Sequence, residues 1–271
     1  MAWTKSKLNR YIKEGRGQGE GANYIPWIKT NEFSSKGRAT RINGIKTNRI
    51  HHLHSDNQLR AFLIFEWSDR VIDIRESYPL LDLMEVVDKK DDLRLDKFVD
   101  KETGEPYVLT TNFLITTRNE HGQIEYFARA VKNYSELHRK STIEKFEIER
   151  RYWLAKGIDW KVITNRELNK QFCKNIEWVR ETLIQESKGT SEIKKLSEEL
   201  IFYLISSQQI RLKDLLKQFE GTNSLEAGTG LYIFRYLVAR KIIQINMKEK
   251  VDMNKKAKDI ILKLNYEGDR L

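Results

Sequence analysis

Three polar side chains in this sequence have the types and spacing to act together at one site. Asn112 lies within Thr111–Leu114, Lys132 ends the stretch Phe127–Lys132, and Gln58 stands upstream. One acid on a helix, one acid on a strand and a lysine on the next strand is the pattern of metal-dependent nucleases, in which anionic oxygens hold a hard cation and lysine steadies the developing charge. The pattern therefore predicts a site that cuts phosphodiesters. The uncharged amides at positions 58 and 112 predict that this copy does not cut.

The elements around these residues are expected to bring them together. Apolar residues at helical spacing predict a helix over 55–67, with Ser55 as its N-cap and Gln58 in its first turn. Strands are predicted at 71–80, 107–116 and 124–132, with a hairpin turn at 119–122 that places Asn112 and Lys132 on adjacent antiparallel strands.

Further elements complete an α/β layer arrangement around a mixed sheet. Residues 82–101 are expected to form an exposed insertion or irregular loop, and Ser141 or Thr142 is expected to cap a helix that runs to Trp153. A last strand is predicted at 159–164. We expect one domain over residues 1–165, with a basic N-terminal arm.

The remainder, residues 166–271, is expected to be a second, mainly helical domain. Helices are predicted at 191–207, 212–219 and 225–241, followed by a strand at 242–247 that enters a small β-wing. This is a helix-turn-helix or winged-helix pattern, which serves for DNA binding or for protein docking. From Arg180 onward there are 17 basic and 13 acidic residues. This near balance of positive and negative charge favours protein docking by the second domain. The first domain should therefore be the main DNA contact.

The bulk properties of the 271 residues favour a polyanionic partner. The net charge is +10 and the pI is about 9.4. One cysteine excludes an intramolecular disulfide and a cysteine zinc cluster, and no apolar run could span a membrane. We expect a soluble intracellular protein.

Several residues outside the three-residue pattern could contact DNA. The glycine-rich stretch Gly15–Gly21 is interpreted as a flexible arm that carries Lys13 and Arg16 to a phosphate chain, or as a plain surface loop. His51 and His52 lack the further ligands of a zinc site, so we expect them to contact nucleic acid or the sheet.

Each site residue also has an ordinary structural interpretation. Lys132 can be a solvated residue at a strand end, Asn112 a strand-edge polar residue, and Gln58 a first-turn helix residue. The charge run 144–151 can be a helix face stabilised by i, i+4 pairs, although Glu149 could point at the site. Only the joint pattern favours a nuclease.

The sequence resembles the TnsA family, the endonuclease subunits of heteromeric Tn-seven-like transposases. The resemblance covers roughly residues 10–180 and rests on Ile12–Gly19, Tyr24–Trp27, His51–Leu53, Phe65–Trp67, Asp73–Glu76, Glu149–Trp153 and Asn175–Trp178. It implies a restriction-endonuclease-like domain followed by a winged-helix-like, partner-binding domain.

The resemblance also implies an activity and partners. It implies cleavage of double-stranded DNA, dependent on Mg²⁺ or alternatively Mn²⁺, at the 5′ ends of a transposon on the non-transferred strand. The DDE transposase TnsB would cut and join the 3′ ends, and the AAA+ regulator TnsC would bind the C-terminal region. A protein of this kind works in the bacterial cytoplasm, at the nucleoid.

Carried over residue by residue, the family's helix glutamate falls on Gln58, its strand aspartate on Asn112 and its lysine on Lys132. The backbone carbonyl of Ala130 is expected to be a further metal ligand, and Glu149 matches a further acid of the family. Two isosteric losses of charge look more like inactivation than drift. The alternatives are a non-catalytic DNA-binding and assembly subunit of the transposase, or a stand-alone restriction-type nuclease.

Overall fold

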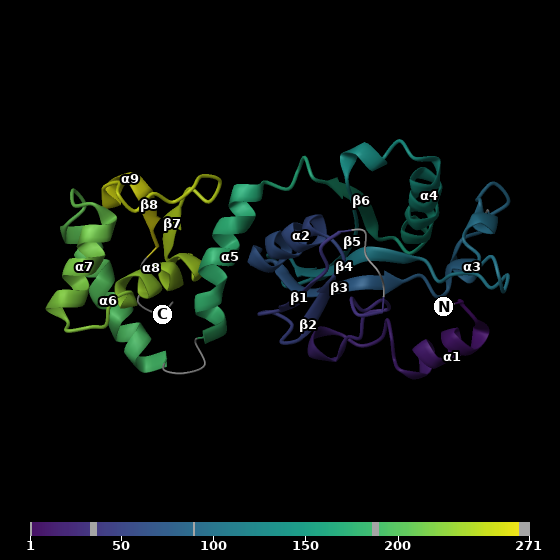
Figure 1. The fold of residues 1–271 in the computed structure, drawn as a ribbon, viewed down its shortest axis with the longest axis horizontal. Coiled ribbons are helices and arrows are strands. Elements are labelled where there is room, and N and C mark those ends of the chain that lie inside the picture. Colours follow the sequence, from purple (N-terminus) through teal and green to yellow (C-terminus); the bar gives the residue numbers. More distant parts are fainter. Residues whose placement is uncertain (1, 33–36, 89, 186–189, 266–271) are drawn as a thin grey trace. The chain divides into compact units, whose positions relative to one another are not determined.

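The computed structural model describes residues 2–32, 37–88, 90–185 and 190–265, which divide into two compact units. Unit 1 comprises residues 1–168 and unit 2 comprises residues 169–271 (Figure 1). The division lies close to the boundary at 165/166 expected from the sequence. Each unit is described by itself.

Unit 1 is built on a four-stranded mixed sheet in the order β3-β4-β5-β6. Its strands are β3 (Val71–Pro79), β4 (Thr110–Arg118), β5 (Ile124–Lys132) and β6 (Asp159–Thr164). The first three pair antiparallel, and β5 pairs parallel with β6. A parallel pair needs a long crossover, which helix α4 (Lys140–Ala155) supplies. The predicted mixed α/β architecture is confirmed.

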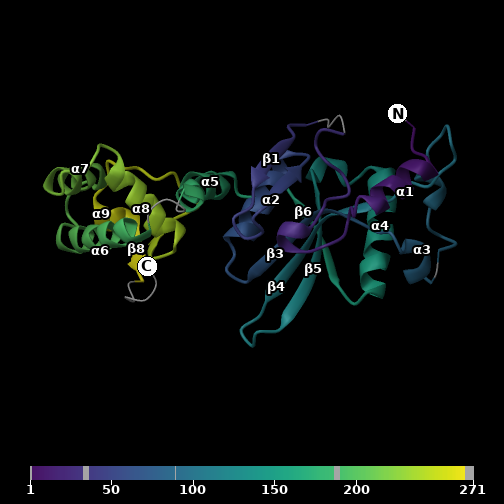
Figure 2. The same ribbon diagram turned by 90° about the horizontal axis from the view of Figure 1, so that it is seen from below.

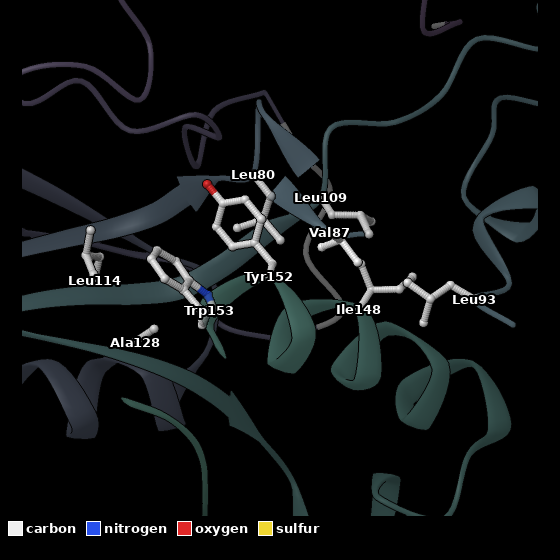
Figure 3. Close-up of a cluster of buried hydrophobic side chains, with 9 residues drawn as sticks. All are labelled: Leu80, Val87, Leu93, Leu109, Leu114, Ala128, Ile148, Tyr152 and Trp153. Carbon is white, nitrogen blue, oxygen red and sulfur yellow. The ribbon is translucent and has the colours of Figure 1, made fainter. Parts of the chain in front are cut away.

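The helices α2 (Asp56–Trp67) and α4 cover opposite faces of this sheet. Phe113 on β4 meets Phe65 of α2 with ring centroids 5.4 Å apart, whereas its neighbour Leu114 packs in a core cluster with Trp153 of α4 (Figure 3). Successive residues on a strand face opposite sides, so the two contacts place the two helices on opposite faces. The β4–β5 hairpin extends away from both (Figure 2).

The core under α4 includes part of a segment that the sequence predicted only in part. Residues 82–101 were expected to form an exposed insertion or irregular loop, and most of the described ones do lie at least partly exposed, but they also contain α3 (Leu83–Val86) and a 3₁₀ turn at Leu95–Lys97. Val87 and Leu93 are buried in the same cluster as Trp153 (Figure 3). The apolar residues here follow no helical or strand period, so the pattern hid their burial.

The N-terminal segment is also part of the fold of unit 1. It forms α1 (Lys5–Lys13), a 3₁₀ turn at Gly21–Asn23, and the paired strands β1 (Thr40–Asn43) and β2 (Ile50–Leu53). Gly17 has a positive φ of 75°, and a Cβ there would lie 2.2 Å from Cγ of Pro79 at the end of β3. The Tyr24 hydroxyl donates to the Glu76 carbonyl at 3.0 Å. The expected flexible arm is therefore wrong: the glycines allow close packing against β3.

Unit 2 is mainly helical, as predicted. Its elements are α5 (Lys170–Gln185), α6 (Thr190–Ser206), α7 (Leu212–Thr222), α8 (Thr229–Ala239), β7 (Ile243–Ile245), α9 (Ala257–Ile260) and β8 (Ile261–Leu264). β7 and β8 form a two-stranded antiparallel sheet. The helix predicted from Leu225 begins at Thr229, because Gly228 precedes it in the left-handed region with φ 96°. No helix in the described part of the chain has the length and apolar content to cross a membrane.

Candidate active site

Gln58, Asn112 and Lys132 line one cavity of about 570 Å³ in unit 1. They come from the first turn of α2, the beginning of β4 and the end of β5. Side chains of α4 line the same cavity, among them Thr142 and Lys145. The fold therefore brings together three residues that are up to 74 positions apart in the chain.

Gln58 is held by the N-terminal cap of α2. Its backbone N–H donates to Oγ of Ser55 at 3.2 Å, which confirms Ser55 as the N-cap. Its side-chain Oε1 in turn accepts a hydrogen bond from the backbone N–H of His54 at 2.8 Å. In a capping box the side chain three positions after the cap accepts from the backbone N–H of the cap residue itself. Here the corresponding donor is His54, the residue before the cap.

Asn112 lies where the sheet opens between β4 and β5. The paired residues of these strands end at Phe113 and Arg129, although β4 begins at Thr110 and β5 continues to Lys132. Across the opening, Oδ1 of Asn112 accepts a hydrogen bond from the backbone N–H of Val131 at 2.6 Å. The side chain thus replaces a hydrogen bond of the ladder and fixes the backbone just before Lys132.

The charged groups of the cavity make it more basic than acidic. Nζ of Lys132 lies 3.6 Å from Oε2 of Glu136, and both side chains are partly exposed. Lys145 adds a second ammonium group. Burial lowers the pKa of His54, a further lining residue, so its ring is neutral at neutral pH.

These residues do not fit a hard divalent cation. No group of three or more His, Cys, Asp or Glu side chains in the described part of the chain could hold a metal ion. The oxygens of Gln58 and Asn112 are neutral and already accept backbone hydrogen bonds. Glu136 carries a charge, but it pairs with Lys132 and with Arg139 at 2.8 Å. The donor set offers too little negative charge to replace the water shell of Mg²⁺.

Comparison with known proteins relates both units to one family. Residues 68–165 match the family model described as TnsA-like endonuclease N terminal, and residues 167–247 match the one described as TnsA endonuclease C terminal. The Escherichia coli protein described as "Transposon Tn7 transposition protein TnsA" is 35% identical over 258 residues, which cover 94% of this chain and 90% of that protein. The chain belongs to the TnsA endonuclease family. The resemblance found in the motifs is thereby confirmed, together with the restriction-endonuclease-like fold of unit 1.

In this TnsA-family chain, Glu149 lies behind the cavity instead of lining it. Glu149 is 1% exposed. Its Oε2 accepts hydrogen bonds from Oγ1 of Thr111 at 2.9 Å and Nε1 of Trp160 at 3.3 Å, and its Oε1 lies 3.2 Å from Nζ of Lys145. Glu149 therefore reaches the site through Lys145. Ala130, the expected carbonyl ligand, is fully buried on β5, and its role stays a prediction.

Two of the residues expected to bind DNA are wrongly assigned. Arg16 is 3% exposed, and its guanidinium donates to Glu14 at 2.7 Å and to Glu32 at 2.6 and 2.7 Å. His51 is completely buried, with Nδ1 2.8 Å from Oε2 of Glu76 and Nε2 2.7 Å from Oγ1 of Thr47. Their polar atoms are used inside unit 1, so neither can reach a DNA phosphate.

The other two DNA-binding assignments stay predictions. Lys13 is exposed at the end of α1. His52 is half-buried, and its Nδ1 lies 3.0 Å from Oγ1 of Thr30. Burial lowers the pKa of His52, so its ring is neutral at neutral pH and would contribute no charge to DNA binding.

His51 belongs to a buried network centred on Glu76. Both oxygens of Glu76 accept hydrogen bonds from the Arg49 guanidinium, at 2.9 and 2.6 Å. Burial opposes ionisation of the carboxyl group, but the bonds from His51 and Arg49 lower the pKa of Glu76 to about 2. The network joins β2 to β3. In the chain, β2 is followed by α2, which carries Gln58.

Lys145 and Asn57 are cavity residues that the sequence reasoning missed. Lys145 was assigned to an ordinary charged helix face, although its spacing of four residues from Glu149 was a usable signal. Asn57 donates from Nδ2 to Oδ1 of Asn133 at 2.8 Å and thereby links α2 to the residue after Lys132. No local pattern distinguished it from any other first-turn residue.

Proposed function

We propose that this protein is the TnsA-type subunit of a transposase, and that its DNA-cutting step is blocked in the chain as it stands. By analogy with the family, it would act at transposon ends, on the 5′ strand that is not transferred. The observation that carries the proposal is that Gln58 and Asn112 stand as neutral amides in the same cavity as Lys132. The subunit would bind double-stranded DNA and take part in assembly while contributing no cleavage.

The chemistry of the amides supports this proposal. Each amide keeps the shape of the corresponding carboxylate and the hydrogen bond to a backbone N–H, from His54 in one case and Val131 in the other. Each lacks the anionic oxygen that holds Mg²⁺ or Mn²⁺ and so lowers the barrier to phosphodiester hydrolysis. The fold is therefore preserved while the metal-binding charge is lost.

The partners are proposed by analogy with the family. A DDE transposase of the TnsB type would cut and join the 3′ ends, and an AAA+ regulator of the TnsC type would bind unit 2. The near balance of charge from Arg180 onward, with 17 basic and 13 acidic residues, suits protein docking better than DNA binding. A stand-alone nuclease gains no support from a site without metal-binding carboxylates.

We expect no 5′-strand nicking by the native chain in a reconstituted reaction with Mg²⁺ or Mn²⁺. The reaction contains the DDE partner, the AAA+ partner and transposon-end DNA labelled separately on each strand. Cleavage of the 3′ strand by the DDE partner in the same tube shows that the complex has assembled. Robust 5′-strand nicking would refute the assignment of Gln58 and Asn112 to the site.

DNA binding should survive the amides. Two fewer negative charges beside phosphates reduce repulsion, so the native chain should bind duplex DNA as tightly as the Gln58→Glu, Asn112→Asp variant or more tightly. Fluorescence anisotropy without metal, at matched salt, measures the difference, which should shrink as salt is raised. Clearly weaker binding by the native chain would show that these two residues do not face DNA.

A further inference from the structure

Lys145 presents a second positive charge to the cavity, from a different element than Lys132. It lies on α4, whereas Lys132 ends β5, and both side chains line the cavity. Their side chains have similar exposed fractions, 33% and 36%. The cavity thus holds two ammonium groups from two different elements.

The position of Lys145 is fixed by its surroundings. Its Nζ donates to the carbonyl of Thr110 at 2.9 Å and lies 3.2 Å from the Glu149 carboxylate. Glu149 is itself oriented by Thr111 and Trp160. Thr111 in turn accepts a hydrogen bond from Nε1 of Trp153 at 2.7 Å. A lysine side chain held at two points, one of them the buried Glu149 carboxylate, loses less entropy on binding than a free surface lysine.

The other polar groups of the cavity also suit an anion. Asn57, Asn112 and Gln58 are neutral, and the ring of His54 is neutral at neutral pH because burial lowers its pKa. Glu136 is the carboxylate among the described lining residues, and it is shared between Lys132 and Arg139. The lining residues thus carry two ammonium groups and one shared carboxylate, and the Glu149 carboxylate that pairs with Lys145 lies outside the lining, so the lining itself favours an anion over a divalent cation.

We propose that Lys145 and Lys132 form a phosphate seat that holds a DNA phosphate directly, without a metal ion between protein and DNA. Lys145 binds the phosphate, and Glu149 is a positioning residue that holds Lys145 in place. This inference rests on the proposed DNA-processing role. It assigns to this chain a DNA contact that does not require carboxylates at positions 58 and 112.

The test is DNA binding by the full chain in EDTA, measured by anisotropy across a salt series. Lys145→Gln and Lys132→Gln should each weaken binding several-fold, and each should reduce the slope of log K against log salt by about 0.9. Lys145→Arg should restore most of the affinity. Lys156→Gln is the matched control. Lys156 caps the same helix, is 32% exposed and pairs with Asp82 at 2.6 Å, but it does not line the cavity.

The control distinguishes the phosphate seat from a general effect of removing one positive charge. If Lys145→Gln and Lys156→Gln give the same affinity and the same salt slope, the seat is refuted. Lys145→Gln leaves the buried Glu149 without its cation and can lower stability. The comparison is therefore repeated in a Glu149→Gln background, which removes the buried charge. There, Lys145→Gln should still weaken binding and reduce the slope, and an unchanged slope overturns the proposal.

This experiment can fail independently of the proposed function. It contains no metal and measures no cleavage. If the native chain leaves the 5′ strand intact and Lys145→Gln does not change the salt slope, the proposed function is supported and the phosphate seat is refuted. If the native chain nicks the 5′ strand and Lys145→Gln reduces the salt slope, the phosphate seat is supported and the proposed function is refuted.

Discussion

The Gln58→Glu, Asn112→Asp double variant is expected to gain metal-dependent 5′-strand cleavage that the native chain lacks. Both substitutions restore an anionic oxygen while keeping the acceptor that His54 or Val131 now uses. We expect the rate to rise at least roughly 10²-fold above the native background, the scale of effect when an electrostatic element of a site is added or removed. Strand-specific labelling of transposon ends, with partners and Mg²⁺ present, measures it.

Adding Lys132→Ala to the restored variant should abolish most of this gain. Lys132 lines the same cavity, and loss of a cation beside the developing charge typically costs roughly 10²- to 10³-fold in rate. Each single substitution, Gln58→Glu or Asn112→Asp, serves as a control that restores one carboxylate and should remain nearly inert. A restored double variant that assembles with its partners and stays inert would show that the chain lacks more than two charges.

The second large effect is expected at Glu76, on stability. Glu76→Ala leaves the guanidinium of Arg49 buried without its carboxylate, so the free energy of unfolding should fall by about 3–5 kcal/mol. Asp159→Ala is the control. It removes an ion pair of similar length, with Arg129 2.7 Å from one carboxylate oxygen, but Asp159 is 41% exposed and the change should be below about 1 kcal/mol. Guanidinium unfolding followed by tryptophan fluorescence compares the two.

The same carboxylate makes a prediction about pH. Because the pKa of Glu76 falls from its ordinary 4.5 to about 2 on folding, its contribution is present above pH 4.5 and is lost as the pH falls towards 2. That contribution is on the order of 3 kcal/mol. Glu76→Gln should lose it at every pH. A native chain and a Glu76→Gln chain with parallel stability profiles between pH 5 and pH 2 would show that Glu76 carries no such linkage.

The convergence of Gln58, Asn112 and Lys132 could be predicted because local signals fix the elements that carry them. Ser55 marks the start of α2, and the turn before β5 sets the register between β4 and β5. Once the strands pair, their ends must meet. The mixed sheet follows from the same elements, since a strand that follows α4 pairs parallel with β5.

The burial of Arg16 and His51 could not be predicted, because their partners are distant in sequence or locally unremarkable. Glu32 and Glu76 look like surface residues in their own stretches, and only the folded chain brings them to Arg16 and His51. The role of Lys145 could not be predicted for a different reason. Its neighbours form so many charged pairs along α4 that one lysine with a buried partner could not be distinguished.

The way in which the side-chain oxygens of residues 58 and 112 are used has an evolutionary consequence. Each accepts a bond from a backbone N–H, a task that an amide performs as well as a carboxylate. A gene can therefore exchange acid for amide at these codons, each by a single base change, without exposing the subunit to degradation of a misfolded chain. On this proposal, selection can act on catalysis and on stability separately at these two positions, and the same base changes in reverse would restore the carboxylates that cutting requires.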